Sequence, residues 1–466
     1  MTVRVGQTDR PLFLRQLSTD EYLPQPYSDV DKLVVAKTVD RIETASAERR
    51  RDVSDLADGR AGTAAGLREL NAEWGETYYD VPEDAVRDDD AASDVFDGPE
   101  FVIDVQTHFM APHGVRSFPT QMLIDLYRAT MPTWWTQLDD IVAMDLACYI
   151  RNVFLECETG VAVLTSGPGV DDWRNLFNDE MHATRMLIDG LAGTGRLLNH
   201  AVVHPKIDHE LEGMEAFRDE FQPAGWKVYT LGVLTEQGPQ EGWALTDDEG
   251  MRFLEKARAL DVRLVCAHKG ISWLANNGSP ADIGPAAKAF PDLDFLIYHS
   301  GYEMESYGAP PEGPFTEETA DDGINRLIKS VRDAEIDRTN GNVYAELGTT
   351  WFSVIRRPEE AAHVMGKLLL HFGADNIVWG TDSIFYGSAQ PLIDAFRTFQ
   401  IPDRLCEQFG YPKLTAEAKD KILSRNAARL YKVDVPTMQE RVKNDDLSWA
   451  RDLLREVEKH GFAGLR

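Results

Sequence analysis

Four histidines and one aspartate carry the clearest chemical signal in the sequence, because each lies at the end of a predicted strand. They are His108 in Asp-Val-Gln-Thr-His, His204 in Ala-Val-Val-His, His268 in Val-Cys-Ala-His, His299 in Leu-Ile-Tyr-His and Asp382 in Trp-Gly-Thr-Asp. Imidazole nitrogens and carboxylate oxygens are the ligands that Zn²⁺, Mn²⁺ and Fe²⁺ take in proteins. If these strands end at one place in the fold, the sequence predicts a metal-dependent site there.

The elements that must position these residues form a regular series from residue 101 onward. Short apolar, β-branched runs alternate with amphipathic stretches, as expected for buried parallel strands separated by helices. The predicted strands are 101–106, 160–165, 197–204, 227–231, 264–268, 295–299, 343–347 and 377–381, and the predicted helices include 172–191, 247–260, 321–338 and 358–372. Eight such units predict a (β/α)8 barrel, in which all strands open onto one mouth. An open doubly wound sheet is the alternative, but no Gly-x-Gly-x-x-Gly follows the first strand.

The barrel is predicted to occupy only part of the chain. Residues 1–100 form an N-terminal helical and acidic extension, with helices expected near 33–57 and 64–74. The barrel covers 101–401, and the C-terminal region 402–466 is expected to be helical and to pack outside it.

Three segments interrupt this pattern. Residues 80–100 are dominated by acidic side chains and are interpreted as a solvated linker, with docking on a neighbouring subunit as the alternative. Insertions at 111–159 and 301–319 each follow a strand's carboxyl end, where loops line barrel active sites. Each is expected to be a lid or substrate wall, or else a loop decoration or dimer contact.

The composition limits the classes of partner. The chain has 48 Lys and Arg against 78 Asp and Glu, for a formal net charge of −30. This charge repels phosphate backbones and anionic membrane surfaces, so neither nucleic acid nor a membrane is an expected partner. The four cysteines form no Cys-x-x-Cys pair, and the first residues lack the apolar stretch of a signal peptide. We therefore expect a cytoplasmic protein.

The segments around the candidate residues resemble the amidohydrolase superfamily, in particular the amidohydrolase-related branch that includes aminocarboxymuconate-semialdehyde decarboxylase. The resemblance covers about 101–431 and is carried by Asp104-Val-Gln-Thr-His108, Val265-Cys-Ala-His268, Tyr298-His299-Ser-Gly and Gly380-Thr-Asp382. It implies that His108, His268 and Asp382 are metal ligands and that His299 is a catalytic histidine. It also implies a divalent metal cofactor, with zinc expected first and manganese or iron as alternatives, a small-molecule substrate and a homodimer.

One position departs from the family pattern. The first strand of the family usually carries His-x-His, or Glu-x-His in some decarboxylases, whereas this chain carries Gln106-Thr-His108. Residues i and i+2 of a strand point to the same side, so Gln106 takes the place of the first ligand. Its amide oxygen is a neutral donor. Three outcomes are therefore open: a weaker or harder-ion site, a three-ligand site with an extra water, and no metal at all.

The leading hypothesis is a metal-dependent hydrolase that acts on a small organic, aromatic or cyclic substrate. In that mechanism a bound ion activates water, Asp382 accepts a proton from it, and His299 donates to the developing oxyanion. A nonoxidative decarboxylase on the same barrel is the alternative, favoured if Arg or Lys side chains from the insertions line the pocket. A metal-free binding protein is the third hypothesis, and Gln106 is the feature that supports it.

Other residues near the strand ends have less specific roles. His204 is interpreted as structural or substrate-facing, and Lys269 as a solvent-exposed loop lysine in preference to a contact for an anionic substrate. Trp134, Trp135 and Trp351 would form an aromatic wall for a ring-bearing substrate, or would pack in the core.

Overall fold

The computed structural model contains all eight of the predicted barrel strands. They are β1 (Ile103–Thr107), β2 (Val161–Leu164), β3 (Leu197–Asn199) continued by β4 (Ala201–Val202), β5 (Trp226–Tyr229), β8 (Leu264–His268), β9 (Asp294–Tyr298), β10 (Val343–Glu346) and β11 (Ile377–Val378). Every residue of β8 and of β10 is buried, which is why their sequences do not alternate and are apolar up to the polar residue that ends each strand. The structure describes residues 9–17, 25–49, 52–87, 89–111, 144–169, 174–231, 234–235, 238–239, 242–271, 278–305, 308–338 and 341–460.

Parallel pairing joins these strands in order around a closed barrel. One series runs β1-β2-β3, and a second runs β4-β5-β8-β9-β10-β11. His200 separates β3 from β4, so a single irregular strand belongs to both series. The chain after β11 pairs with β1, since Val105 N donates to Trp379 O at 3.2 Å and Asp382 N donates to Gln106 O at 2.9 Å. These bonds close the ring, and the predicted (β/α)8 fold is confirmed.

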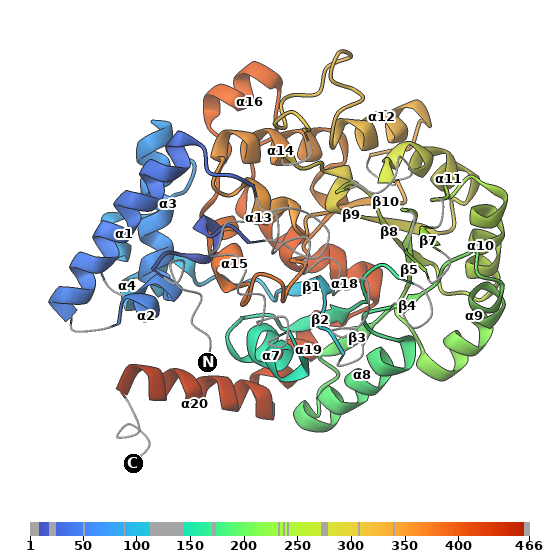
Figure 1. Ribbon diagram of the computed structural model, residues 1–466, viewed down its shortest axis with the longest axis horizontal. Coiled ribbons are helices and arrows are strands. Elements are labelled where there is room, and N and C mark those ends of the chain that lie inside the picture. Colours follow the sequence, from blue (N-terminus) through green and yellow to red (C-terminus); the bar gives the residue numbers. More distant parts are fainter. Residues whose placement is uncertain are drawn as a thin grey trace.

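Helices cover the outside of the barrel (Figure 1). Those between the strands are α8 (Asn178–Ala192), α9 (Asp208–Phe221), α10 (Asp248–Ala259), α11 (Ile283–Ala289), α12 (Asn325–Asp333), α13 (Thr350–Val354) and α14 (Pro358–His371). After β11 come α15 (Gln390–Thr398), α16 (Asp403–Phe409), α17 (Ala416–Asp420), the π-helical turn η11 (Lys421–Arg425) and α18 (Asn426–Tyr431). The turn η11 and α18 pack against β1 and β11. In this contact Asn426 Nδ2 donates to Ile377 O at 2.8 Å.

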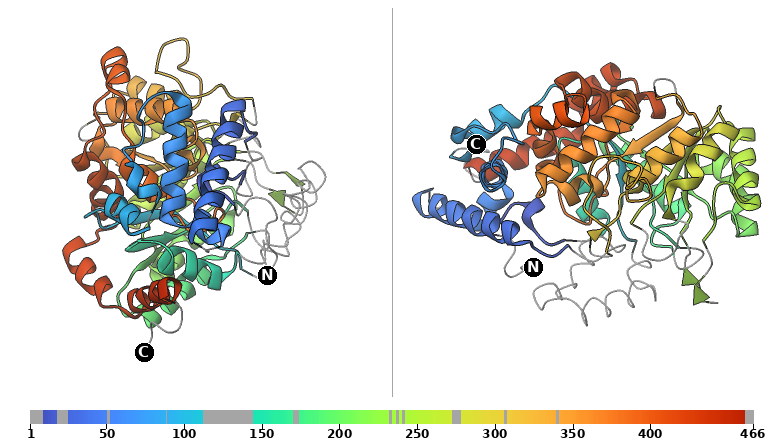
Figure 2. Two further views of the ribbon diagram at one scale, coloured as in Figure 1. Left: turned by 90° about the vertical axis from the view of Figure 1, so that its left-hand side faces the viewer. Right: turned by 90° about the horizontal axis from the view of Figure 1, so that it is seen from above.

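The N-terminal extension forms a helical layer at one side of the barrel (Figures 1 and 2). It contains η1 (Leu12–Leu14), α1 (Asp29–Arg49), α2 (Val53–Asp58), α3 (Arg60–Trp74), η2 (Glu83–Val86) and α4 (Asp89–Phe96). Both α3 and α4 contact α15. The interpretation of 80–100 as a linker is wrong for the part that forms η2 and α4. Ala92 and Phe96 are four residues apart and fully buried, so an apolar helix face outweighs the acidic composition.

A buried ion pair ties the C-terminal helices to the barrel. These helices are α19 (Val435–Lys443) and α20 (Asp446–His460), and α20 packs against α8. Arg196 Nη1 lies 3.2 Å from Asp445, and both side chains are 0% exposed. Among the described residues, no helix has the length and apolar character needed to cross a membrane.

The two predicted insertions differ in how much of each is described. Most of 111–159 lies outside the described residues, and its last part forms α7 (Leu146–Ile150) and the π-helical turn η4 (Arg151–Leu155). In the segment 301–319, Lys367 of α14 donates to Glu312 and to Gly313 O, the latter at 3.1 Å. These bonds anchor this part of the segment to the outer helix layer.

Candidate active site

The strand ends bring five candidate side chains to one mouth of the barrel. Gln106 and His108 lie at the end of β1, His268 is the last residue of β8, His299 directly follows β9, and Asp382 follows β11. All five are buried, with His108 the most exposed at 4%. The chemistry of this mouth therefore takes place in a largely dry environment, where charges and dipoles interact more strongly than in water.

Several residues of the mouth have a left-handed backbone. The φ angle is 62° at His299, 57° at Thr349 and 61° at Asp382. This conformation is unfavourable for side chains with a Cβ, and most of all for a β-branched residue such as threonine. Such conformations persist where the surrounding contacts determine them, and they cluster at active sites.

Gln106, His108 and Asp382 form a compact group, which we call the donor trio. Gln106 Nε2 donates to Asp382 Oδ1 at 2.9 Å and lies 3.4 Å from His108 Nε2. His108 Nε2 lies 3.0 Å from the same Asp382 Oδ1. The spacing of two along β1 places the first two side chains on one face, and the barrel closure places Asp382 beside them.

The separations within the donor trio fit three ligands of one metal ion. Ligands about 2.1 Å from a metal, at angles between about 90° and 109°, lie about 3.0 to 3.4 Å from one another. Among the described residues, no group of three or more His, Cys, Asp or Glu side chains is placed to hold a metal ion. The three close donors are therefore His108, Asp382 and the amide of Gln106, and His268 does not lie among them. The Oε1 atom of Gln106 has no hydrogen-bond partner in the part of the chain that the structure describes, and a half-turn of the amide would exchange it with Nε2.

His268 and His299 form a second pair at the same mouth. His299 Nδ1 lies 2.8 Å from Gly348 O, and His299 Nε2 lies 3.2 Å from His268 Nδ1. A carbonyl oxygen only accepts, so Nδ1 of His299 carries its proton and Nε2 accepts from His268 Nδ1. The Nε2 atom of His268 then bears the lone pair that a metal ligand needs.

Burial keeps His299 neutral. It lowers the pKa of His299 to about 4, although the charge of Asp382 acts in the opposite direction. A neutral ring with its proton on Nδ1 has an accepting Nε2. The predicted donation from His299 to an oxyanion therefore requires prior protonation at Nε2, which burial opposes.

Asp382 is held in its ionised form. Burial alone would raise the pKa of this carboxyl group, but the hydrogen bond and charge of His108, together with the hydrogen bond from Thr349, lower it to about 2. Thr349 donates its hydroxyl proton to Asp382 Oδ2. Thr349 was not among the residues expected from the sequence. The only signal for it is its place just after β10, at the same mouth.

Glu346 connects three strand ends beneath the candidate residues. Its carboxylate accepts from His299 N at 2.9 Å and from Gly348 N at 2.6 Å. Burial raises the pKa of Glu346 to about 8. A Cβ at Gly380 would lie 1.9 Å from Glu346 Oε1, so only glycine allows this close approach of β11. Glu346 therefore fixes the backbone on which His299 sits.

Lys269 and His204 also lie near the strand ends, and Lys269 is in an ion pair whereas His204 packs against an aromatic ring. Lys269 is fully buried and lies 2.8 Å from Asp282, so the prediction of a solvent-exposed lysine is wrong. Its charge is compensated by a carboxylate that follows later in the chain. His204 is buried with its ring edge toward Trp243, at a centroid separation of 6.4 Å, and among the described residues neither ring nitrogen has a hydrogen-bond partner.

The predicted aromatic wall is not formed by Trp351. This side chain is buried, donates from Nε1 to Leu392 O at 2.9 Å, and packs edge-on against Phe396 and Phe399. It therefore belongs to the core between the barrel and α15. Trp134 and Trp135 lie outside the described residues.

The chain is a closed (β/α)8 barrel, and imidazole, amide and carboxylate groups are buried at the carboxyl ends of its strands. This is the place where (β/α)8-barrel enzymes carry their active sites. Within this class, the amidohydrolase family model matches residues 103–433. The chain belongs to the amidohydrolase family and is an enzyme. The family indicated by the strand-end motifs is thereby confirmed.

Three solved structures that are similar to this chain are the following. An uncharacterized TIM-barrel protein from Bordetella bronchiseptica is 14% identical over 72% of this chain and 99% of that chain, with a TM-score of 0.48. A 5-carboxyvanillate decarboxylase from Novosphingobium aromaticivorans, complexed with manganese, is 13% identical over 72% and 97% of the two chains, with a TM-score of 0.46. A 2,6-dihydroxybenzoate decarboxylase from Rhizobium is 15% identical over 72% and 99%, with a TM-score of 0.42. No curated protein sequence matches this chain.

Proposed function

We propose that the chain is a divalent-metal-dependent hydrolase of a small organic substrate. The observation that carries this proposal is the donor trio, in which Gln106, His108 and Asp382 lie 2.9 to 3.4 Å from one another at the barrel mouth. Three donors with these separations and a second imidazole pair nearby are suited to one divalent ion. Zinc is proposed, with manganese and iron as alternatives, because the donor set is nitrogen and oxygen.

The proposed ligands are Gln106 through Oε1, His108, and Asp382 through Oδ1. His268 is proposed as a fourth ligand through Nε2, which must move toward the donor trio to reach the ion. When bound, a divalent ion would lower the pKa of a water molecule toward about 7 and polarise a carbonyl or phenolic oxygen. His299 holds His268 in the tautomer that leaves Nε2 unprotonated. Neighbours that fix the tautomer and orientation of a ligating histidine support metal binding.

Asp382 is the proposed proton carrier. Its carboxylate is ionised at neutral pH, so it can accept the proton of the attacking water and return it to the leaving group. The hydrogen bond from Thr349 to Oδ2 keeps Oδ1 directed toward Gln106 and His108, where the metal would bind. His299 is proposed to act beside it by orienting His268.

Nonoxidative decarboxylation is the second candidate. The donor trio contains a single carboxylate, so the metal-loaded site would keep a net positive charge. Such a site attracts an anionic substrate, including an aromatic acid whose carboxylate leaves as CO₂. In the segment 301–319, however, the sequence contains no Arg or Lys that would hold such a carboxylate.

Two measurements test the proposal. Elemental analysis of the purified full chain should find close to one divalent metal ion per chain, and metal-free protein that takes up none on incubation would contradict the proposal. Hydrolysis and CO₂ release are then assayed in parallel on a panel of lactones, amides and aromatic acids. Release of CO₂ without hydrolysis would favour the second candidate.

A further inference from the structure

The hydroxyl groups of Thr349 and Tyr386 form a hydrogen-bonded line that starts at the Asp382 carboxylate. Gln106 and His108 contact Oδ1 of this carboxylate, whereas Thr349 donates to Oδ2. Tyr386 Oη lies 2.6 Å from Thr349 Oγ1. Thr349 and Tyr386 are only 1% and 2% exposed, so water does not compete effectively for these bonds. The two residues come from different loops, after β10 and after β11.

The direction of the hydrogen bonds follows from the number of protons. A threonine hydroxyl has one proton, and Thr349 gives it to the Asp382 carboxylate. Tyr386 must therefore be the donor in its bond to Thr349. Both bonds point toward the negative charge, and bonds arranged in this way polarise and strengthen one another.

Both hydroxyl-bearing residues, Thr349 and Tyr386, are held in place by their surroundings. Thr349 has a φ angle of 57°, which a β-branched residue adopts only where its surroundings enforce it. The Tyr386 ring stacks on Phe352 of α13, with ring centroids 4.0 Å apart and an interplanar angle of 17°. Rotation of either hydroxyl away from its partner is therefore restricted.

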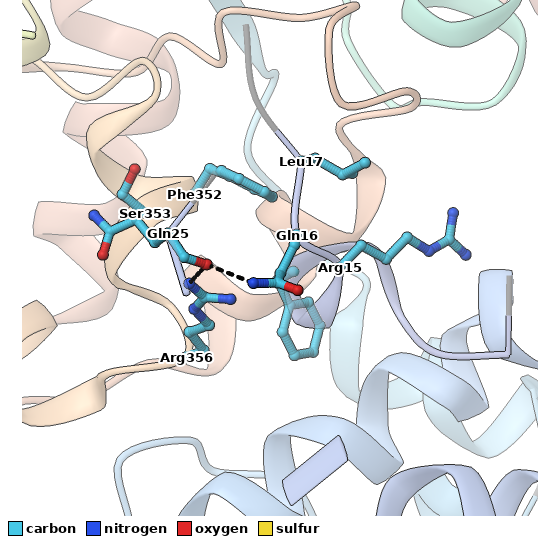
Figure 3. Close-up of a pocket in the computed structure, with 8 residues that line it drawn as sticks. Arg15, Gln16, Leu17, Gln25, Phe352, Ser353 and Arg356 are labelled. Carbon is cyan, nitrogen blue, oxygen red and sulfur yellow. Dashed lines mark hydrogen bonds between the residues drawn. The ribbon is translucent and has the colours of Figure 1, made fainter. Parts of the chain in front are cut away.

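Residues of the N-terminal extension share a pocket with one of the two stacked rings. Phe352 lines this pocket together with Gln16, Leu17 and Gln25 (Figure 3). Gln25 O accepts from Gln16 Nε2 at 3.0 Å and from a terminal nitrogen of Arg356 at 2.9 Å (Figure 3). These N-terminal residues precede the part of the chain that the amidohydrolase model matches, and they line the same pocket as the ring that stacks on Tyr386.

We propose that Thr349 and Tyr386 are positioning residues that hold the Asp382 carboxylate with Oδ1 directed at Gln106 and His108. The inference rests on the proposed function, because Oδ1 is the oxygen offered to the metal. Partners that hydrogen-bond a ligating carboxylate orient it, and their loss typically weakens metal binding about 10-fold to 100-fold. Without the hydroxyl at position 349, Oδ2 loses its donor and the carboxylate can rotate.

The test compares Thr349→Val, Thr349→Ser and Tyr386→Phe with the wild type in the full chain. Valine keeps the shape of threonine without the hydroxyl, and serine keeps the hydroxyl. Thr184→Val is the matched control, since Thr184 is a buried threonine of α8 whose hydroxyl donates to Glu180 O. The dissociation constant for Mn²⁺ is measured by electron paramagnetic resonance, together with the melting temperature and a crystal structure of Thr349→Val.

We expect Mn²⁺ binding to weaken about 10-fold or more in Thr349→Val and in Tyr386→Phe. Thr349→Ser and Thr184→Val should bind like the wild type, and the crystal structure should show a rotated Asp382 carboxylate. Unchanged binding in Thr349→Val with an unmoved carboxylate would overturn the proposal. Equal losses in the valine and serine variants, with a parallel drop in melting temperature, would overturn it as well.

A wild type that binds no Mn²⁺, Zn²⁺ or Fe²⁺ would contradict the proposed function and not the positioning role. The crystal structure of Thr349→Val then decides alone. A rotated carboxylate supports the role of the two hydroxyls, and an unmoved one overturns it.

Discussion

Replacing Gln106 with glutamate keeps the shape of the side chain and adds one negative charge to the donor trio. Gln106 Nε2 lies 2.9 Å from Asp382 Oδ1, so the substitution places two carboxylates in contact. Two unit charges at this distance repel by about 6 kcal/mol at an effective dielectric constant of about 20. A divalent cation bound between the two carboxylates attracts both of them, so the added negative charge then stabilises the protein. We therefore expect Gln106→Glu to destabilise the metal-free protein and to strengthen metal binding.

The pH dependence of the metal-free variant follows from the same repulsion. Two carboxylates in contact cannot both ionise readily, so one of them has a raised pKa in the folded protein. A raised folded-state pKa contributes stability at low pH that is lost as the pH rises through it. The stability gap between Gln106→Glu and the wild type should therefore be small near pH 5 and larger near pH 8.

Thermal unfolding measured in EDTA and in excess Mn²⁺ tests this prediction. Gln106→Glu should melt below the wild type in EDTA and should gain more from Mn²⁺ than the wild type does. Gln400→Glu is the matched control, because Gln400 is exposed and its hydrogen bonds go to Tyr78 and Thr77 of the N-terminal extension. If Gln106→Glu melts like the wild type in EDTA and responds no more strongly to Mn²⁺, the assignment of Gln106 to the metal site is refuted.

Three other substitutions test separate parts of the account. Asp382→Asn should reduce turnover at least about 100-fold in whichever assay the wild type responds to, with an unchanged circular dichroism spectrum. Arg196→Met should lower the free energy of unfolding in urea by about 3 to 5 kcal/mol, since it leaves Asp445 buried without its partner. Burial raises the pKa of Asp394 in the folded protein to about 7. The free energy of unfolding therefore falls as the pH rises from about 4 to about 7. Asp394→Asn should remove up to about 4 kcal/mol of that fall.

Each of these predictions has a result that contradicts it. Full turnover by Asp382→Asn would remove this residue from the mechanism. If the Arg196→Met/Asp445→Leu double variant is no more stable than Arg196→Met, an unpaired buried charge is not the cause of the loss. Parallel pH profiles for Asp394→Asn and the wild type would show that Asp394 titrates normally.

The barrel was predictable because parallel strands buried on both faces leave a clear pattern in the sequence. Runs such as 264–267 and 343–345 are apolar throughout, and the helices between them are amphipathic. The break at His200 was not predictable, since it depends on how β3 and β4 pair with different neighbours. The helix α4 was missed because its acidic composition hides two apolar positions on one face.

The candidate site was predictable only as far as strand ends and spacing determine it. Gln106 and His108 share a face because they are two residues apart on β1, and Asp382 meets them through barrel closure. The contact of Thr349 with Tyr386 depends on a left-handed backbone and on two loops, neither of which has a sequence signal. The burial of Lys269 likewise depends on Asp282, which reaches it only through the tertiary fold.

The most direct test of the central claim is the anomalous diffraction of a crystal soaked in Mn²⁺. The account predicts a single strong peak in the barrel mouth, about 2.0 to 2.3 Å from His108 Nε2, Asp382 Oδ1 and the amide oxygen of Gln106. A peak that lies elsewhere, or a fully soaked crystal in which these three side chains keep their direct hydrogen bonds, would contradict it.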